Sequence, residues 1–423
     1  MSETLGTLLD GLRTGAWLGR RRVIAYGAIL LVLELAGFAF LVAGTHGLIV
    51  PLDKPTTTDF VSFYAAGKLA AAGTPALAYD PAAHYAAEMA AREPGIQYQF
   101  FFYPPVFILL CALVARLPYM IAFILFEAAT LIPCLLVARG VLQERGATVF
   151  LPLLAFPAVF WTLGLGQNAF LTAALFGGAL LLIDRRPASA GLLLGALCYK
   201  PHFGLLIPVA LAAGGRWRAF AAAAVAVAGL VMLSVALFGW ETWRDCVVAF
   251  ASSHATYESG RIDFSGMVSP FGAVRLLGGS AAAAYAVQGM ATIAAALLVA
   301  WIWRQGLSLP LRAAALAAAT LVAVPVVLIY DLALAGIAMA WLVRAARESG
   351  FLAWEKLALV AAFLVPVASR DIGLAWHLPL APLIPLVLLV LVSFRASRER
   401  ARRKAQFARS SLSPQLTFSA PRT

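Results

Sequence analysis

The chain has 423 residues, of which 62% are hydrophobic and only 12% are charged, and its mean hydropathy is +0.88. About a quarter of the residues of a soluble domain are charged, so this composition excludes an ordinary soluble protein and predicts an all-α polytopic membrane protein within the lipid bilayer. Much of the net charge of +12 lies at 20–22 and from 395 onward, beside apolar runs, which favours anionic lipids over nucleic acid as the partner.

The first apolar run, 23–44, follows three arginines and leads to no small-residue cleavage site. We expect a retained signal anchor with its N-terminus in the cytoplasm. The run at 104–116 is too short to cross the bilayer, which takes about 20 helical residues. It is therefore predicted to be a re-entrant or interfacial helix on the outer side. The other apolar runs lie at 118–138, 148–163, 167–183, 188–199, 203–213, 219–238, 283–303, 310–327, 331–343, 355–368 and 377–394.

The positions of the basic residues between these runs decide which topology we predict. About twelve spans plus one re-entrant element place nearly every basic turn in the cytoplasm, together with both termini. If 104–116 also spanned, most of these arginines would lie outside. The prediction is a multi-pass protein of the cytoplasmic (inner) membrane, with a membrane domain at 1–394 and a basic, disordered cytoplasmic tail at 395–423. The domain carries two long outer loops, at 45–103 and 239–282.

The runs at 188–199 and 203–213 are short and flank Cys198-Tyr199-Lys200-Pro201-His202. They predict a shallow hairpin whose tip lies within or near the outer half of the membrane. Irregular backbone at that depth is tolerated only against protein or a wet cavity, so the hairpin implies a cavity.

Asp59 follows the first span, at the start of the first outer loop. An unperturbed aspartate has a pKa of about 3.9, so it is ionised and able to accept a hydroxyl proton as a general base. The alternative is a loop carboxylate that caps a helix starting at Phe60.

Lys200 is a charge at a membrane-depth turn, which is a functional-site hypothesis by default. Its expected partner is a phosphate, with Tyr199 and His202 close enough to contribute. The alternative is a lysine that snorkels to the outer headgroups.

Three further outer segments carry polar or aromatic side chains. The break at Gln167-Asn168 either binds a sugar through its amides or forms a polar turn. Tyr330-Asp331 either binds a hydroxyl or cation, or starts a helix. The aromatic residues from Tyr98 to Tyr103 either stack on a sugar, line a lipid path or form an interfacial belt.

No cofactor or metal site is predicted. The four cysteines have no paired spacing, and the histidines form no metal-ligand pair at helical spacing. Metal dependence stays open. The absence of an Asp-x-Asp cluster from the outer loops favours metal independence, because Lys200 or Arg275 can meet a charged lipid phosphate instead.

Seven short motifs, taken in order and spacing, resemble glycosyltransferase family 87, the type C membrane glycosyltransferases that use polyprenyl-phosphate sugars. They are Asp59-Phe60 with Tyr64-Ala65-Ala66-Gly67, Ala78-Tyr79-Asp80, Phe102-Tyr103-Pro104-Pro105, Gly166-Gln167-Asn168, Lys200-Pro201, Arg216-Trp217-Arg218, and Pro325 with Tyr330-Asp331-Leu332.

The resemblance implies a type C architecture in which Asp59 is the catalytic aspartate of the first outer loop. It also implies an inverting, single-displacement transfer on the outer side, from a polyprenyl-phosphate sugar to a glycolipid or glycan acceptor. Mannosyl transfer is the best-known activity of the family. One departure is the lack of a histidine in the turn at 326–331, where Tyr330 or Asp331 would have to substitute. The predicted substrate-binding residues are Tyr64, Tyr103, Gln167, Asn168, Lys200, His202, Arg275, Tyr330 and Asp331.

Two other classes compete with the glycosyltransferase. Twelve spans with both termini inside are common in secondary transporters, but the two similar halves that such proteins often contain are not evident here. The long first outer loop and the element at 104–116 also fit a transporter poorly. The other class is a non-catalytic membrane assembly or lipid-binding protein.

Overall fold

A computed structural model describes residues 2–44, 59–92, 95–260 and 262–412. Within these ranges the chain forms α-helices and short 3-10 helices and no β-strand, which confirms the all-α class. Part of the predicted first outer loop, 45–58, and the last residues, 413–423, lie outside the described residues.

The first half of the chain contains two long helices, α2 and α6, and several short ones. They are α1 (Ser2–Thr14), α2 (Arg20–Gly44), α3 (Phe60–Ala71), η1 (Pro75–Tyr79), α4 (Pro81–Ala91), α5 (Pro105–Val114), α6 (Tyr119–Leu142), η2 (Ala147–Val149), α7 (Phe150–Leu154), α8 (Pro157–Leu165), α9 (Ala169–Leu182), α10 (Pro187–Ala196), η3 (Leu197–Tyr199), η4 (Pro201–Gly204) and α11 (Ile207–Ala213).

The second half begins with α12, which is broken at Gly239. Its elements are α12 (Trp217–Glu258), η5 (Phe264–Gly266), α13 (Pro270–Leu276), α14 (Ala281–Arg304), α15 (Leu309–Ala323), η6 (Ile329–Leu332), α16 (Ala333–Ser349), α17 (Glu355–Leu364), η7 (Val365–Val367), α18 (Ser369–Trp376) and α19 (Leu383–Leu412). Helix α15 is buried along almost its whole length and packs against α14, α16 and α19, so the core of the bundle lies there.

Five helical stretches among the described residues are long and apolar enough to cross a membrane, or seven if each of two bent pairs is one span. The expected count of about twelve is not confirmed. Several of the predicted spans are apolar helices of only 10–17 residues, among them α9 and α15. The run at 148–163 is instead bent by 70° between α7 and α8, where Pro157 begins α8.

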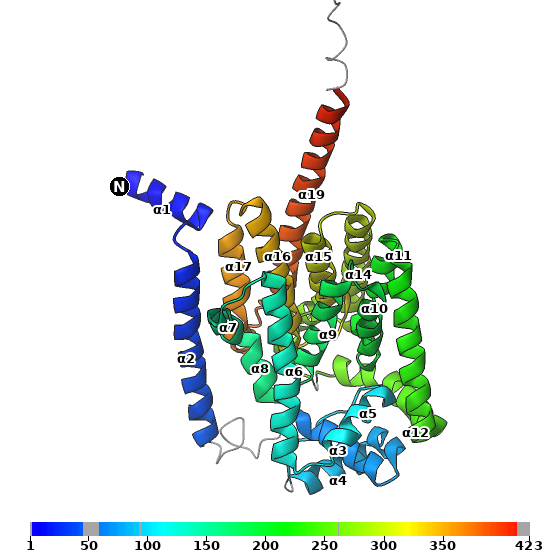
Figure 1. Cartoon of the computed structure of the whole chain (residues 1–423). Coiled ribbons are helices and arrows are strands. Elements are labelled where there is room, and N and C mark those ends of the chain that lie inside the picture. The colour runs from blue at the N-terminus through cyan, green and yellow to red at the C-terminus, as the bar shows by residue number, and fades with distance from the viewer. Residues whose placement is uncertain (1, 45–58, 93–94, 261, 413–423) are drawn as a thin grey trace, which may run out of the picture.

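Figure 1 shows α1 and the far end of α19 at one end of the bundle, and α3, α4 and α5 at the other. The short helix predicted at 104–116 is present as α5, which packs against α3 and α12. Its depth in a membrane stays a prediction. The run from 188 to 213 is the predicted broken pair, with Lys200 between η3 and η4.

The second outer loop was expected at 239–282, and α12 is broken at Gly239, which has a φ of 79°. Beyond this break the chain is helical again to Glu258, and its place outside the membrane stays a prediction. The tail was expected to be disordered from 395, but α19 is helical to Leu412. Arg395 is buried there and pairs with Glu355, while Glu399 accepts a hydrogen bond from the Ser308 hydroxyl at 2.7 Å.

Helices α10 and α12 approach each other closely through two glycines four residues apart. A Cβ at Gly191 would overlap the carbonyl oxygen of Ala219, and a Cβ at Gly195 would overlap that of Ala223. This small-residue spacing lets two helix backbones pack tightly in a bilayer.

We expect Gly191→Ala to destabilise the protein by about 1–3 kcal/mol, as overpacking does, because α12 must shift. Gly229→Ala on α12 is the matched control, since an added Cβ there meets nothing within 4 Å. Thermal unfolding in detergent measures both. Equal unfolding temperatures for Gly191→Ala and Gly229→Ala would contradict the close approach.

Candidate active site

Asp59 stands directly before α3, at the N-cap position, but its side chain caps nothing. Its Oδ2 instead accepts a hydrogen bond from Nε2 of Gln167 at 2.7 Å. Asp80, by contrast, is a true cap, whose Oδ1 accepts from the backbone N–H of Ala83 at 2.8 Å. The capping interpretation of Asp59 is therefore wrong, and its carboxylate is directed at the α8–α9 break.

The break between α8 and α9 supplies the amides around Asp59. Gly166 ends α8 with a φ of 66°, a conformation that glycine adopts without strain. Next to it, Oε1 of Gln167 accepts from the Tyr103 hydroxyl at 3.3 Å and from the backbone N–H of Asn168 at 3.3 Å. Both ends of the Gln167 amide are thus held, so its N–H group points at Asp59.

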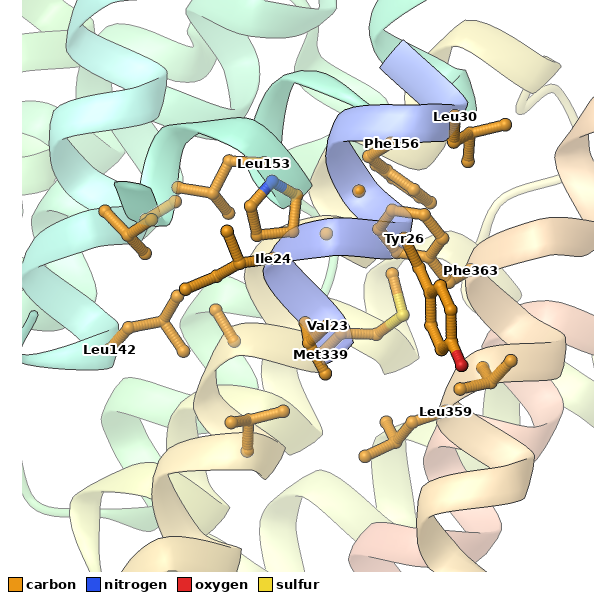
Figure 2. A pocket seen from close by; sticks show the side chains of 18 of the residues that line it. Val23, Ile24, Tyr26, Leu30, Leu142, Leu153, Phe156, Met339, Leu359 and Phe363 are labelled. Carbon is orange, nitrogen blue, oxygen red and sulfur yellow. The ribbon is translucent and has the colours of Figure 1, made fainter. Parts of the chain in front are cut away.

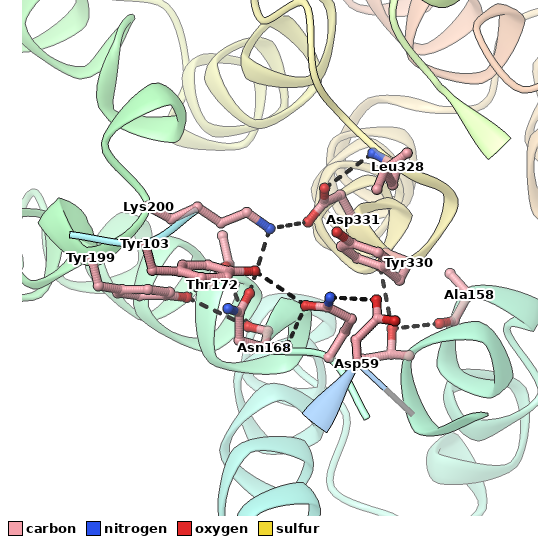
Figure 3. Close-up of polar contacts among 12 residues, drawn as sticks. Asp59, Tyr103, Ala158, Asn168, Thr172, Tyr199, Lys200, Leu328, Tyr330 and Asp331 are labelled. Carbon is pink, nitrogen blue, oxygen red and sulfur yellow. Dashed lines mark hydrogen bonds and ion pairs between the residues drawn. The ribbon is translucent and has the colours of Figure 1, made fainter. Parts of the chain in front are cut away.

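Lys200 is buried, with 3% of its surface exposed, and its ammonium lies 2.5 Å from Oδ1 of Asp331. It also donates to Oδ1 of Asn168 at 3.5 Å (Figure 3). The rings of Phe203 and Tyr330 lie 4.7 and 5.3 Å from the ammonium. The snorkelling interpretation is therefore wrong, and the immediate partner of Lys200 in the structure is a carboxylate.

Asp331 holds both the turn and the lysine. Its Oδ2 accepts from the backbone N–H of Leu328 at 3.2 Å, which closes the start of η6, while Oδ1 pairs with Lys200. The carbonyl of Tyr330 accepts from the Thr162 hydroxyl at 3.2 Å, so this turn is also tied to α8. Asp331 is thus the third residue of η6 and not its N-cap, a position that Leu328 occupies, and its two oxygens bind the backbone of Leu328 and the ammonium of Lys200.

The two carboxylates of this network differ in charge balance. Asp331 is neutralised by Lys200, whereas no cation of the described residues forms an ion pair with Asp59. Burial raises the pKa of Asp59 to about 6, and the hydrogen bond from Gln167 opposes that rise. Asp59 is thus a buried carboxylate that accepts a hydrogen bond from Gln167 and has no ion-pair partner among the described residues.

A family model for glycosyltransferase family 87 matches residues 101–329, more than half of the chain. The chain belongs to glycosyltransferase family 87. It is therefore a membrane glycosyltransferase, and it uses a sugar donor and an acceptor. The matched part includes Tyr103, Gln167, Asn168 and Lys200, while Asp59 and Asp331 lie outside it. No curated protein and no solved structure matches the chain.

Three of the predicted substrate-binding residues of this glycosyltransferase lie outside the network. The Tyr64 hydroxyl donates to the carbonyl of Leu117, and its ring packs against Tyr119. The ring of His202 packs against Phe203. Arg275 donates to two backbone carbonyls, those of Glu258 and Gly279, and so ties α13 to the end of α12. Each of the three side chains thus contacts residues outside the network, and a sequence pattern does not reveal such contacts.

The network of the glycosyltransferase also includes residues that the sequence did not single out. Thr172 donates to the carbonyl of Asn168 at 3.3 Å and lies 2.6 Å from the Tyr199 hydroxyl. Its spacing of four residues from Asn168, which places both on one helix face, was the available signal. Tyr199, which was predicted only as a helper of Lys200, is thereby fixed against α9.

A buried pair of residues on α4 contacts the first turn of α3. His84 and Glu88 on α4 are fully buried, with Nε2 of His84 3.1 Å from the carbonyl of Ser62. Nδ1 of His84 lies 3.6 Å from Oε1 of Glu88. Burial lowers the pKa of His84 to about 4 and raises that of Glu88 to about 8, so both groups are neutral near pH 7. We assign this neutral pair to holding the first turn of α3, and with it Asp59.

Proposed function

We propose that this protein transfers mannose from a polyprenyl-phosphate donor to a hydroxyl of a glycolipid or glycan acceptor. Transfer takes place on the outer, periplasmic face of the inner membrane and inverts the anomeric centre, with Asp59 as the general base. The observation that carries the proposal is the contrast between the two carboxylates. Asp59 has an amide partner and no cation, whereas Asp331 is committed to Lys200.

The reaction is a single displacement at the anomeric carbon. The acceptor oxygen attacks that carbon while its proton passes to the Asp59 carboxylate, and the bond from the anomeric carbon to the phosphate oxygen breaks. The phosphate leaves with the bonding electrons. Gln167 keeps the Asp59 carboxylate in position through the 2.7 Å hydrogen bond. The donor class and the sugar are those that the family resemblance implies.

Lys200 is placed to meet the negative charge that develops on the departing lipid phosphate. An ammonium has three N–H donors, and Asp331 and Asn168 take two of them. The third is left for a phosphate oxygen. A cation already fixed by its neighbours needs no reorganisation in the transition state, which is why such groups stabilise developing charge effectively.

A double displacement is less well supported by this arrangement. It would need a nucleophilic carboxylate and a separate acid–base group. Asp331 is the other carboxylate of the network, and both of its oxygens are already engaged, by Lys200 and by the turn at Leu328. A single displacement requires only one base, and Asp59 can fill that role alone.

The positive-inside pattern supports the proposed orientation. Helix α2 begins at Arg20, Arg21 and Arg22 beside α1, and the far half of α19 carries further arginines. Helices α3 and α5, which frame Asp59, lie at the opposite end of the bundle (Figure 1). In this orientation both termini are cytoplasmic and the site faces outward.

The direct test is a donor panel in proteoliposomes. Wild type is offered polyprenyl-phosphate mannose, polyprenyl-phosphate glucose and a nucleotide sugar, each with glycolipid acceptors. We expect release of free polyprenyl phosphate together with a glycosylated acceptor from the mannosyl donor. Consumption of the nucleotide sugar instead would overturn the proposed donor. Uptake of a sugar into the vesicle with no chemical transfer would favour a transporter.

The pKa of Asp59 sets a pH dependence. The carboxylate must be deprotonated to act as a base, so kcat/KM should rise with pH through a midpoint of about 6 and fall by about tenfold per unit well below it. Gln167→Leu removes the hydrogen bond that stabilises the ionised form and should move the midpoint upward. Rates measured from about pH 4.5 to 8.5 test both statements. A flat profile, or a downward shift in Gln167→Leu, would contradict them.

A further inference from the structure

A large apolar cavity lies away from Asp59, between α2 and the body of the bundle (Figure 2). Its volume is about 750 Å³, and its walls come from α2, α6, α8, α16 and α17. None of the residues of the hydrogen-bonded network lines it. A volume of this order is typical of a ligand site, for which about 300–1,000 Å³ is usual.

Figure 2 shows how apolar the walls are. Tyr26 and Leu30 of α2 face Phe156, Met339 and Phe363 of the bundle across the cavity. The contact between α2 and α7 is close at Gly27, where an added Cβ would lie 2.9 Å from Cα of Pro152. The cavity is therefore an apolar slot between α2 and the body of the bundle, with walls that suit a hydrocarbon chain.

Charged lining residues gather at the end of the cavity nearest α1. Glu144 pairs there with Arg20 at 3.1 Å and with Arg347 at 3.0 Å, and the two guanidinium side chains are 61% and 43% exposed. Lys356 donates to the backbone carbonyls of Gly15 and Leu18. Glu144 is thus shared by two of these cations, Lys356 has no carboxylate partner among the described residues, and this end of the cavity carries a positive surplus.

An unpaired donor lies at the same end. The indole Nε1 of Trp17, which lines the cavity, is buried and has no hydrogen-bond acceptor among the described residues. A buried N–H group without an acceptor is unfavourable, so its presence points to an acceptor supplied from outside the chain.

We propose that this cavity binds one anionic phospholipid from the leaflet on the side of α1. An acyl chain fills the apolar slot, the phosphodiester lies against the positive surplus of Arg20, Arg347 and Lys356, and a lipid oxygen accepts from Trp17. Basic pockets between membrane helices bind anionic headgroups in this way. The site is independent of the proposed sugar transfer, because it lies away from Asp59 and needs no donor or acceptor.

Native mass spectrometry of the full chain in detergent tests the site, with added phosphatidylglycerol, phosphatidylcholine or polyprenyl phosphate. We expect phosphatidylglycerol to bind at least about tenfold more tightly than phosphatidylcholine. Arg347→Gln should weaken phosphatidylglycerol about fivefold, the effect of one surface cation, and leave phosphatidylcholine unchanged. Arg344→Gln is the matched control, one turn away on α16, where Arg344 pairs with Glu348 outside the cavity.

A second pair of variants tests the apolar slot. Val343→Phe places a ring in the cavity and should abolish retention of the lipid, whereas Val225→Phe, on the exposed face of α12, should not. Equal binding of phosphatidylglycerol and phosphatidylcholine to wild type would overturn the proposal. So would retention of polyprenyl phosphate in preference to phospholipid, because the cavity would then belong to the sugar donor.

Discussion

Replacement of Asp59 by asparagine is expected to lower kcat/KM for sugar transfer by about 100-fold or more, since loss of a general base typically costs roughly 10²–10⁴ in rate. Asparagine keeps the size of the side chain, and its oxygen can still accept the hydrogen bond from Gln167. It cannot take up the acceptor proton. The network should therefore persist while the reaction fails, so donor binding should be close to that of wild type.

Asp80→Asn is the matched control for this substitution. Asp80 lies at the same end of the bundle and caps α4 through its contact with Ala83, so its loss should affect stability slightly and transfer little. Transfer by Asp59→Asn at the wild-type rate would mean that Asp59 is not the base. An equal loss in both variants would indicate damage to this end of the bundle as a whole.

Asp331→Asn is expected to produce the largest loss of stability. Lys200 and Asp331 are both buried, and removal of one partner leaves the other charge without compensation, which typically costs about 3–5 kcal/mol. Transfer should fall as well, because Lys200 would no longer be held towards the phosphate. Thermal unfolding in detergent and the proteoliposome transfer assay measure the two effects.

The double variant Lys200→Met/Asp331→Leu separates stability from catalysis. A buried ion pair replaced by apolar side chains of similar size is often no less stable than the original. We therefore expect the double variant to unfold close to the wild-type temperature and still to transfer no sugar at a useful rate. Full activity in the double variant would contradict the role of Lys200, and an unchanged unfolding temperature in Asp331→Asn would contradict the buried pair.

The sequence identified the polar residues of the site because they stand out in an apolar chain. Lys200 was singled out by the high cost of a charge at membrane depth, and Gln167 and Asn168 by a polar break between two apolar runs. Their partners could not be predicted. Lys200 and Asp331 are 131 residues apart, and Asp59 and Gln167 are 108 apart, so only the packed bundle brings them together.

The helix class was predictable from hydropathy, whereas the number of spans was not. Apolar composition does not distinguish one long helix from two short ones that meet at an angle, as α7 and α8 do at Pro157. The tail after residue 394 is more ordered than its sequence predicts. A basic composition predicted disorder after 394, yet Arg395 finds a buried partner in Glu355, and the helix continues.

The most direct test of the central claim is the anomeric configuration of the sugar that wild type transfers from a polyprenyl-phosphate mannose of known configuration, read by NMR of the isolated product. A single displacement with Asp59 as the base predicts inversion, so a β-linked donor should give an α-linked product. Retention would contradict a single displacement with inversion and with it the assignment of Asp59 as the base. Failure to form any product from a lipid-phosphate donor would contradict the proposed reaction itself.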